Sequence, residues 1–183
     1  MDTLKGKTAV ITDPRVASAA PLRCCPRRKA WQWWFTGQMR RVLIEAVDTI
    51  KQAGGCAAYF LGDVAGDGFG TAVTAFATRE FGGVDIMIAN AGAGGLTPFL
   101  EMSAESMRRT LDVHVTGAFL PAQAAARHMV ETGKGGRILL MSSVSGLQAL
   151  FGYAAYASAK AAMMSMARVA AVELLSNRLK VCT

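Results

Sequence analysis

The chain contains 183 residues, of which 52% are hydrophobic and 18% are charged. This composition predicts one compact domain with a sizeable core, and it excludes an intrinsically disordered chain. The net charge of +7 would by itself suggest a nucleic-acid partner. However, residues 13–41 hold seven Lys and Arg residues against Asp13 alone, and they account for +6 of that charge. We therefore expect no nucleic-acid partner, and we keep as an alternative a basic binding module formed by residues 15–41, where aromatic and basic side chains interleave.

Membrane segments and metal-binding motifs are not evident in the sequence. No apolar run approaches the ~20 residues that a bilayer span requires, and residues 1–7 do not have the layout of a signal peptide. The cysteines, at positions 24, 25, 56 and 182, do not follow metal-ligand or redox spacing. We predict a cytoplasmic protein with no membrane partner and no metal site.

Short apolar segments alternate with segments of helical periodicity along the chain. In chain order, the sequence predicts a strand at 7–12, a helix at 41–53, a strand at 56–61, a helix at 70–81, a strand at 85–90, a helix at 103–131, a strand at 137–142, a helix at 153–175 and a strand at 179–182. Gly117 and Pro121 weaken the prediction of one continuous third helix. Apolar strands that are separated by helices indicate a parallel sheet covered on both faces. The sequence thus predicts a doubly wound α/β domain over residues 1–183.

The carboxyl ends of the predicted strands carry the candidate site residues, because ligands of such sheets bind at that edge. In chain order these residues are Asp63-Val64, Asn90-Ala91-Gly92 and Ser143. Tyr156 and Lys160 follow on the next helix, where a spacing of four residues places both on one face. The positive charge of Lys160 favours the phenolate form of Tyr156, which predicts a general acid/base. Ser143 could supply a hydroxyl group to the same substrate oxygen.

Each of these features also has a purely structural interpretation. A Tyr-x-x-x-Lys pair occurs in many helices, a serine at a strand end can cap a loop, and Asp63 and Gly92 can serve only to turn the chain. The functional interpretation is favoured because the features occur together, in this order, at one edge of the predicted sheet.

Residues 56–182 resemble the short-chain dehydrogenase/reductase family. Asp63-Val64 is similar to the family's Asp-Val/Leu pair, and Asn90-Ala91-Gly92 is similar to its Asn-Ala-Gly motif. Ser143, Tyr156 and Lys160 are similar to its catalytic serine, tyrosine and lysine. The resemblance implies a Rossmann-like fold, an NAD or NADP cofactor, and hydride transfer between the nicotinamide and the carbon of a small-molecule alcohol or carbonyl substrate.

The resemblance also implies a role for each matching residue. Tyr156 would pass the proton, Ser143 would hold the substrate oxygen, and Lys160 would hold the nicotinamide ribose. Asp63 would contact the adenine amine, and Asn90-Ala91-Gly92 would shape the floor of the cofactor site. Family members commonly pair through the helices that match residues 103–131 and 153–175, which implies a homo-oligomer.

The sequence departs from the family pattern at His114, where the family usually has an asparagine that positions a water molecule in the proton relay. His114 could donate a similar hydrogen bond, and we therefore include it among the candidate catalytic residues. A structural histidine is the alternative.

A larger departure follows the first strand. The family has Thr-Gly-x-x-x-Gly-x-Gly there, whose backbone amides receive the cofactor's pyrophosphate. Here Thr12 is followed by Asp13-Pro14, and the first glycine after it is Gly37. An aspartate repels phosphate and a proline has no N–H group to donate. Residues 13–39 therefore form an atypical segment without a phosphate loop.

A reading-frame shift explains this segment. When the last base of each codon from Thr12 onward is read with the first two bases of the next codon, residues 31–36 become Ala-(Met/Val)-Val-Val-(His/Tyr), a typical buried strand, whereas the tryptophan-rich sequence as written is a poor one. The same frame permits the family's glycine motif upstream. A true insertion is the alternative.

The family also continues beyond the position of Thr183, with a further strand and a loop that covers the substrate. We therefore expect an incomplete Rossmann-like sheet in which the second strand is disrupted and the last strand and substrate loop are missing. The alternative to an active oxidoreductase is an inactive remnant or mistranslated fragment that binds no cofactor.

Overall fold

The computed structural model describes residues 4, 6–12, 30–35, 40–93 and 95–183. The expected loss of the phosphate loop concerns residues 13–29, which lie outside the described residues, as do residues 36–39 of the atypical segment.

A six-stranded parallel sheet with the order β3-β2-β1-β4-β5-β6 forms the centre of the fold. Its strands are β1 Ala9–Thr12, β2 Ala30–Phe35, β3 Cys56–Leu61, β4 Ile86–Ala89, β5 Gly136–Leu140 and β6 Leu179–Cys182. The chain moves outward from β1 to β3 and then returns to the other side of β1 to form β4. This reversal of strand order confirms the doubly wound, Rossmann-like sheet.

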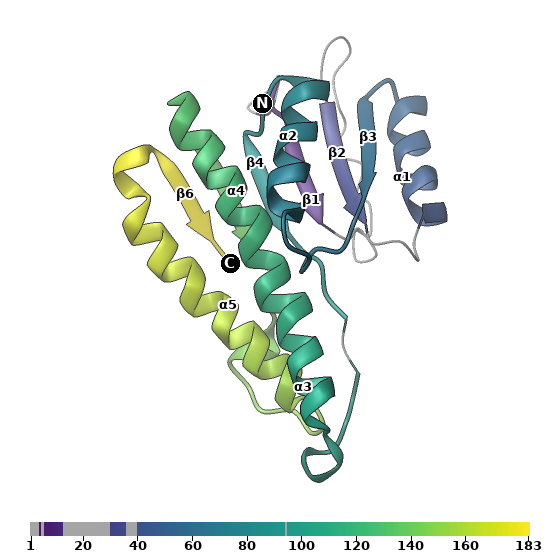
Figure 1. The fold of residues 1–183 in the computed structure, drawn as a ribbon, viewed down its shortest axis with the longest axis vertical. Helices are drawn as coiled ribbons and strands as arrows, with labels where there is room; N and C mark the ends of the chain where they lie inside the picture. The colour runs from purple at the N-terminus through teal and green to yellow at the C-terminus, as the bar shows by residue number, and fades with distance from the viewer. Residues whose placement is uncertain (1–3, 5, 13–29, 36–39, 94) are drawn as a thin grey trace.

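The described residues that connect the strands form the α-helices α1 Arg40–Gln52, α2 Phe69–Phe81, α3 Ala104–Leu111, α4 Gly117–Thr132 and α5 Ala154–Glu173. In Figure 1, α2, α4 and α5 cross one face of the sheet, and α1 lies beside β3. The main core lies under these three helices, where Val10, Met87 and Ile138 of the sheet pack with residues such as Met129 and Met163.

On each strand, the residues next to these core residues in the sequence face the opposite side of the sheet. Ala9 and Ile86 are buried there and pack with Ile50 of α1 and with Leu139. Because successive side chains of a strand point to opposite faces, both faces are apolar, as the continuous apolar strands predict.

The helix predicted over residues 103–131 is interrupted. The hydroxyl of Ser103 accepts a hydrogen bond from the Ser106 N–H at 3.1 Å and caps the start of α3. A π-helical turn at Asp112–Thr116 then separates α3 from α4, and Pro121 lies inside α4. The wider turn corrects the expected uniform helix, and such turns occur often at functional sites.

The second strand differs from its expected disruption. The backbone of β2 pairs in parallel with β1, from Ala9↔Trp31 to Thr12↔Trp34, and with β3, from Ala30↔Cys56 to Phe35↔Leu61. The position between β1 and β3 is therefore filled by the sequence as written. The side chains of β2 lie outside the described residues.

Among the described residues, no helix is long and apolar enough to cross a membrane. Within the same part of the chain, no cluster of His, Cys, Asp and Glu has the composition of a metal site.

Candidate active site

The carboxyl ends of β1 and β4 are joined by the side chain of Thr12, which is fully buried. Its hydroxyl oxygen accepts hydrogen bonds from the backbone N–H groups of Asn90 and Ala91, at 2.9 and 3.0 Å. These two N–H groups follow the last residue of β4 and cannot pair within the strand. The conformation of the Asn90-Ala91-Gly92 segment is thus fixed by the last residue of β1.

His114 lies directly against this segment. Its Nε2 is 2.6 Å from the carbonyl oxygen of Ala93. A carbonyl only accepts hydrogen bonds, so Nε2 carries the proton and Nδ1 is left as an acceptor. Nδ1 is buried and has no hydrogen-bond partner among the described residues. A side chain at Gly92 would collide with the imidazole, since its Cβ would lie 2.9 Å from Nδ1.

The imidazole of His114 is held in its neutral form. Only 1% of the residue is exposed, and this burial lowers the pKa of His114 below its usual 6.5. The bond to Ala93 acts in the opposite direction and raises the pKa, whereas the nearby charge of Lys160 lowers it further. At neutral pH, His114 is therefore a hydrogen-bond donor through Nε2 and carries no charge.

The ring of Tyr156 lies between several of the predicted site residues. The His114 imidazole meets it edge-on, with ring centroids 5.1 Å apart and an angle of 87°. The ring of Tyr153 packs on it at 5.7 Å. The ammonium nitrogen of Lys160 is 5.5 Å from the centroid of the Tyr156 ring. The four-residue spacing on α5 therefore brings Tyr156 and Lys160 together, as predicted.

Lys160 is a buried cation. Only 4% of the residue is exposed, and its Nζ donates a hydrogen bond of 2.5 Å to the carbonyl oxygen of Met141, at the carboxyl end of β5. Burial lowers the pKa of Lys160 from 10.5 to about 8, because the apolar surroundings disfavour the charged form. The role of the Met141 carbonyl could not be read from the sequence, because a backbone acceptor leaves no motif.

The loop after β5 carries Ser143 and is bound to α5 through the neighbouring residue Ser142. The hydroxyl of Ser142 donates to the backbone carbonyl of Lys160 at 2.9 Å and so ties this loop to α5. The hydroxyl of Ser143 accepts from the Ser145 N–H at 3.2 Å, which begins the 3₁₀ turn Val144–Gly146. A Cβ at Gly146 would lie 3.0 Å from the carbonyl carbon of Lys160, so the turn packs closely on α5.

Asp63 and Val64 follow β3 and contact other parts of the chain. One carboxylate oxygen of Asp63 accepts a hydrogen bond from the Ala65 N–H at 3.0 Å, so the residue forms the turn that its side chain favours. Val64 is 2% exposed and packs against Gly117, where a Cβ would lie 2.6 Å from the Val64 methyl carbon. Val64 therefore helps to position the first turn of α4.

The positions of the described residues can be compared with what the two ends of a dinucleotide would require. The buried imidazole leaves space only for a glycine at position 92. The Lys160 ammonium lies at the carboxyl end of β5, and the Tyr156 ring lies against His114. Asp63 follows the end of β3, three positions from β4 along the sheet. These residues could hold the adenine and the nicotinamide ribose. After Thr12, where the phosphates would be held, Asp13 brings a negative charge and Pro14 has no N–H group to donate.

Comparison with known proteins places this geometry in a family. The family model of the short chain dehydrogenases matches residues 30–183, so the segment with Asp13 and Pro14 lies outside the match. An uncharacterized oxidoreductase of Escherichia coli is 39% identical over 103 residues, which cover 56% of this chain and 41% of that protein. The L-rhamnose 1-dehydrogenase (NAD(P)(+)) of Azotobacter vinelandii is 34% identical over 131 residues, which cover 72% of this chain and 51% of that protein. The chain spans about half the length of these curated relatives.

Solved structures agree with this result. A short-chain type dehydrogenase/reductase from Mycobacterium marinum superposes with a TM-score of 0.82 at 32% identity, covering 97% of this chain and 73% of that one. An NAD⁺-bound xylitol dehydrogenase superposes with a TM-score of 0.89 at 26% identity, covering 98% and 69%. The family match over most of the chain, together with the arrangement of Tyr156, Lys160 and the β4 end, shows that this protein belongs to the short-chain dehydrogenase/reductase family.

Proposed function

We propose that this site belongs to an NAD(P)-dependent oxidoreductase that interconverts an alcohol and a carbonyl group in a small molecule. The observation that carries the proposal is the cluster in which the Tyr156 ring contacts His114 and lies 5.5 Å from the Lys160 ammonium. A phenol beside a cation at the carboxyl edge of a parallel sheet is suited to exchange a proton with a bound substrate.

Tyr156, Lys160 and Ser143 have distinct roles in the proposed reaction. In the reducing direction, the Tyr156 hydroxyl gives its proton to the carbonyl oxygen, and the Ser143 hydroxyl donates a hydrogen bond to the same oxygen. The charge of Lys160 stabilises the phenolate that remains on Tyr156. The nicotinamide, when bound, supplies the hydride. The buried position of Lys160 strengthens its effect, because charges interact more strongly away from water.

His114 acts in this proposal as a positioning residue. Its Nε2–H holds the Ala93 carbonyl, and its ring supports one edge of Tyr156. The imidazole thereby links the floor of the cofactor site, Asn90-Ala91-Gly92, to the proton donor. Because the only N–H group of the neutral imidazole is donated to Ala93, this role differs from the water-positioning role of the family's asparagine.

The cofactor is NAD or NADP. The name of the Azotobacter relative includes both nucleotides, and the xylitol dehydrogenase structure contains NAD⁺. Asp63 would contact the adenine, and Lys160 with Tyr156 would contact the nicotinamide ribose.

A second candidate function is an inactive member of the family. It is favoured by Asp13-Pro14 after β1 and by the start of the family match at residue 30. Losing several charge-assisted hydrogen bonds, at about 1.5–3 kcal/mol each, would weaken nucleotide binding by orders of magnitude. Under this alternative, the Tyr156 cluster is inherited but unused.

Calorimetric titration with the oxidised and reduced forms of NAD and NADP separates the two candidates. Micromolar affinity for either nucleotide would support the oxidoreductase and contradict the inactive form. If binding is absent, the gene should be rebuilt in the alternative frame from Thr12 to Met39. A repaired chain that is stabilised by nucleotide, by about 2.7 kcal/mol at a hundred times the Kd, would assign the loss to this segment. If the repaired chain melts identically with and without nucleotide, the frame-shift explanation is wrong.

In whichever chain binds nucleotide, Tyr156→Phe tests the catalytic assignment. Turnover of a panel of polyols, sugars and small ketones should disappear, whereas nucleotide affinity should change by less than about threefold, because the phenol serves the proton. Tyr153→Phe is the matched control, since Tyr153 packs on Tyr156 and should retain turnover. Turnover in Tyr156→Phe would refute the role of the phenol.

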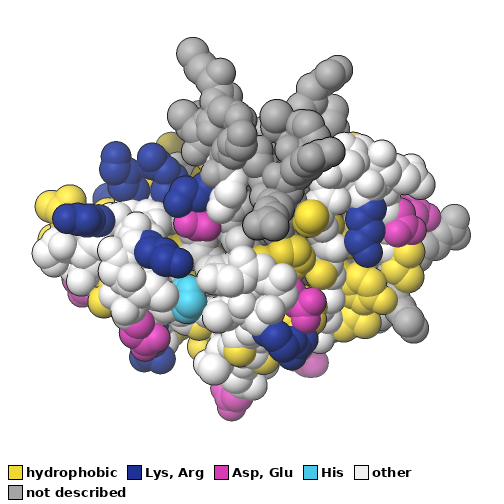
Figure 2. Space-filling view, turned by 90° about the horizontal axis from the view of Figure 1, so that it is seen from above, with side chains coloured by type: hydrophobic (Ala, Val, Ile, Leu, Met, Phe, Trp, Pro, Cys, Tyr) yellow, Lys and Arg dark blue, Asp and Glu magenta, His cyan; other side chains and the backbone are white. Residues whose placement is uncertain are grey.

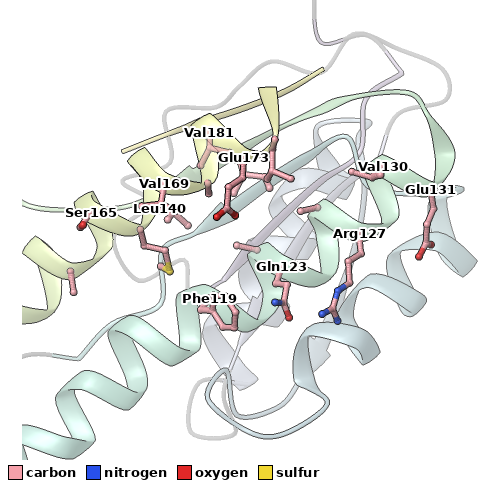
Figure 3. A pocket seen from close by; sticks show the side chains of 17 residues that line it. Phe119, Gln123, Arg127, Val130, Glu131, Leu140, Ser165, Val169, Glu173 and Val181 are labelled. Atoms are coloured by element: carbon pink, nitrogen blue, oxygen red, sulfur yellow. The ribbon is translucent and has the colours of Figure 1, made fainter. Parts of the chain in front are cut away.

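We further propose that the protein is a homo-oligomer. A groove of about 850 Å³ separates α4 from α5, and Figure 3 shows Phe119, Gln123 and Arg127 along the α4 side with Ser165, Val169 and Glu173 along the α5 side. Val169 is 54% exposed, and the groove floor is formed by apolar residues of β5 and β6. In this proposal a second copy of the chain covers the groove.

The charges on α4 support a two-fold symmetric contact. Arg127 and Glu131 lie one turn apart on the rim of the groove, so antiparallel packing of α4 on its own copy would place each beside the opposite charge. Sedimentation should show a dimer that Val169→Glu dissociates, whereas the exposed Val144→Glu, outside the groove, should not. A monomer at all concentrations would refute this proposal.

A further inference from the structure

A second hollow, of about 240 Å³, lies at the amino ends of β4, β5 and β6, which is the edge of the sheet opposite to Tyr156 and Ser143. Its titratable lining residues are five basic and one acidic: Lys7, Lys134, Arg137, Arg178, Lys180 and Asp85. This set is called the basic pocket below. Figure 2 looks down on this end of the molecule and shows Lys and Arg side chains gathered on the side where Figure 1 draws β6.

Two tight turns bring these side chains together. Gly133 ends α4 in a left-handed conformation with φ 65°, and the chain reverses through Lys134 and Gly135 into β5. Arg178, with φ 60°, makes a similar reversal before β6. The two turns touch, because a Cβ at Gly135 would lie 2.7 Å from the Arg178 carbonyl oxygen.

The single acidic residue of the basic pocket is already engaged. Asp85 accepts a hydrogen bond from the Lys7 ammonium at 2.8 Å and another from the Thr8 N–H at 2.9 Å. It therefore neutralises Lys7. The other four basic side chains make no ion pair within the part of the chain that the structure describes.

Two of these four cations are direct neighbours across the sheet. Arg137 of β5 and Lys180 of β6 are register partners, so their side chains stand on the same face of adjacent parallel strands. Like charges in such a pair are destabilising. Arg137 and Lys180 are both exposed, so the side chains are open to a dissolved anion.

We propose that the basic pocket binds a compact polyanion that carries at least two phosphate groups. Four cations converge without a protein counter-charge, and two of them are arginines, whose planar guanidinium matches phosphate oxygens in pairs. The volume of about 240 Å³ is smaller than the roughly 300–1,000 Å³ of ordinary ligand pockets. The site thus suits a diphosphate group, free or at the end of a metabolite, better than an extended nucleic acid.

The basic pocket is independent of the proposed oxidoreductase site. The two sites are separated by the length of β5, whose residues rise about 3.3 Å each. No residue of the basic pocket is assigned a role with nicotinamide or substrate. An anion could therefore bind here whether or not the chain binds NAD or NADP.

Inorganic pyrophosphate is the probe, measured by calorimetry and by thermal unfolding of the full chain at constant ionic strength. The unfolding temperature should rise saturably with pyrophosphate and rise less with phosphate or sulfate. Arg137→Gln/Lys180→Gln should weaken pyrophosphate binding by about tenfold or more. Without ligand, this variant should melt no lower than the natural chain, because it removes a repulsion. Lys134→Gln is a second variant, which should also weaken pyrophosphate binding and which alters neither β5 nor β6.

Arg108→Gln/Arg109→Gln is the matched control, since it removes the same charge from exposed residues of α3. It should bind pyrophosphate as the natural chain does. Equal weakening in the control, or a response that follows ionic strength alone, would overturn the proposal. Tighter binding of a single-stranded oligonucleotide than of pyrophosphate, lost in the same variant, would also overturn it and identify a nucleic-acid surface.

Discussion

Replacing Lys160 with methionine, which has a similar length and no charge, tests whether the burial of this cation destabilises the fold. The pKa of Lys160 falls from 10.5 to about 8 on folding. At about 1.4 kcal/mol per pH unit, this difference corresponds to about 3 kcal/mol of destabilisation at neutral pH. The variant removes this destabilisation. It also leaves the Met141 carbonyl without its 2.5 Å hydrogen bond, which lowers the free energy of unfolding by about 1–3 kcal/mol. Near pH 7 the two effects should largely offset each other.

The pH dependence distinguishes the two effects. Between pH 8 and 10.5 the unfolded chain holds the Lys160 proton and the folded chain does not, so the free energy of unfolding rises with pH in this window. Relative to Lys160→Met, the natural chain should gain up to about 3 kcal/mol across it. Urea unfolding at pH 7, 8, 9 and 10 measures this difference. Lys51→Met, on the exposed end of α1, is the control. A difference between the natural chain and Lys160→Met that stays constant with pH would refute the reasoning.

Two further substitutions examine the contact between the imidazole and the β4 end. The pKa of His114 lies below 6.5 because of burial, so the unfolded chain takes up this proton first and stability falls as the pH drops below 6.5. His114→Asn should reduce that fall in urea unfolding. Gly92→Ala places a Cβ 2.9 Å from the imidazole Nδ1 and should destabilise the fold by about 1–3 kcal/mol. Gly95→Ala, which meets no atom within 4 Å, should be neutral, and equal unfolding midpoints for the two alanine variants would contradict the contact.

Much of the sheet could be predicted from the sequence because its strands are short apolar runs between turns. The predicted ranges 56–61 and 179–182 coincide with β3 and β6. The relation between Tyr156 and Lys160 could also be predicted, because it depends only on the geometry of one helix.

Other features of the site depend on tertiary contacts and have no local signal. The π-helical turn at Asp112–Thr116 contains His114, whose imidazole fits against Gly92, twenty-two residues earlier in the chain. The position of Lys160 depends on the Met141 carbonyl, and Thr12 holds Asn90 through a hydroxyl that any buried strand could carry. Such contacts form only when the ends of different strands come together in the fold. They therefore cannot be predicted from the spacing of residues in the sequence.

The second strand shows why a sheet can form where a phosphate site cannot. Strand pairing uses backbone N–H and C=O groups, which every residue except proline supplies in full, and the neighbours β1 and β3 both offer partners to Ala30–Phe35. Side-chain preference modifies such a strand only weakly, because context outweighs intrinsic propensity. A pyrophosphate site, by contrast, requires glycines at fixed positions after Thr12, where the chain has Asp13-Pro14. The atypical sequence over residues 13–39 should therefore reduce nucleotide affinity far more than it disturbs the sheet.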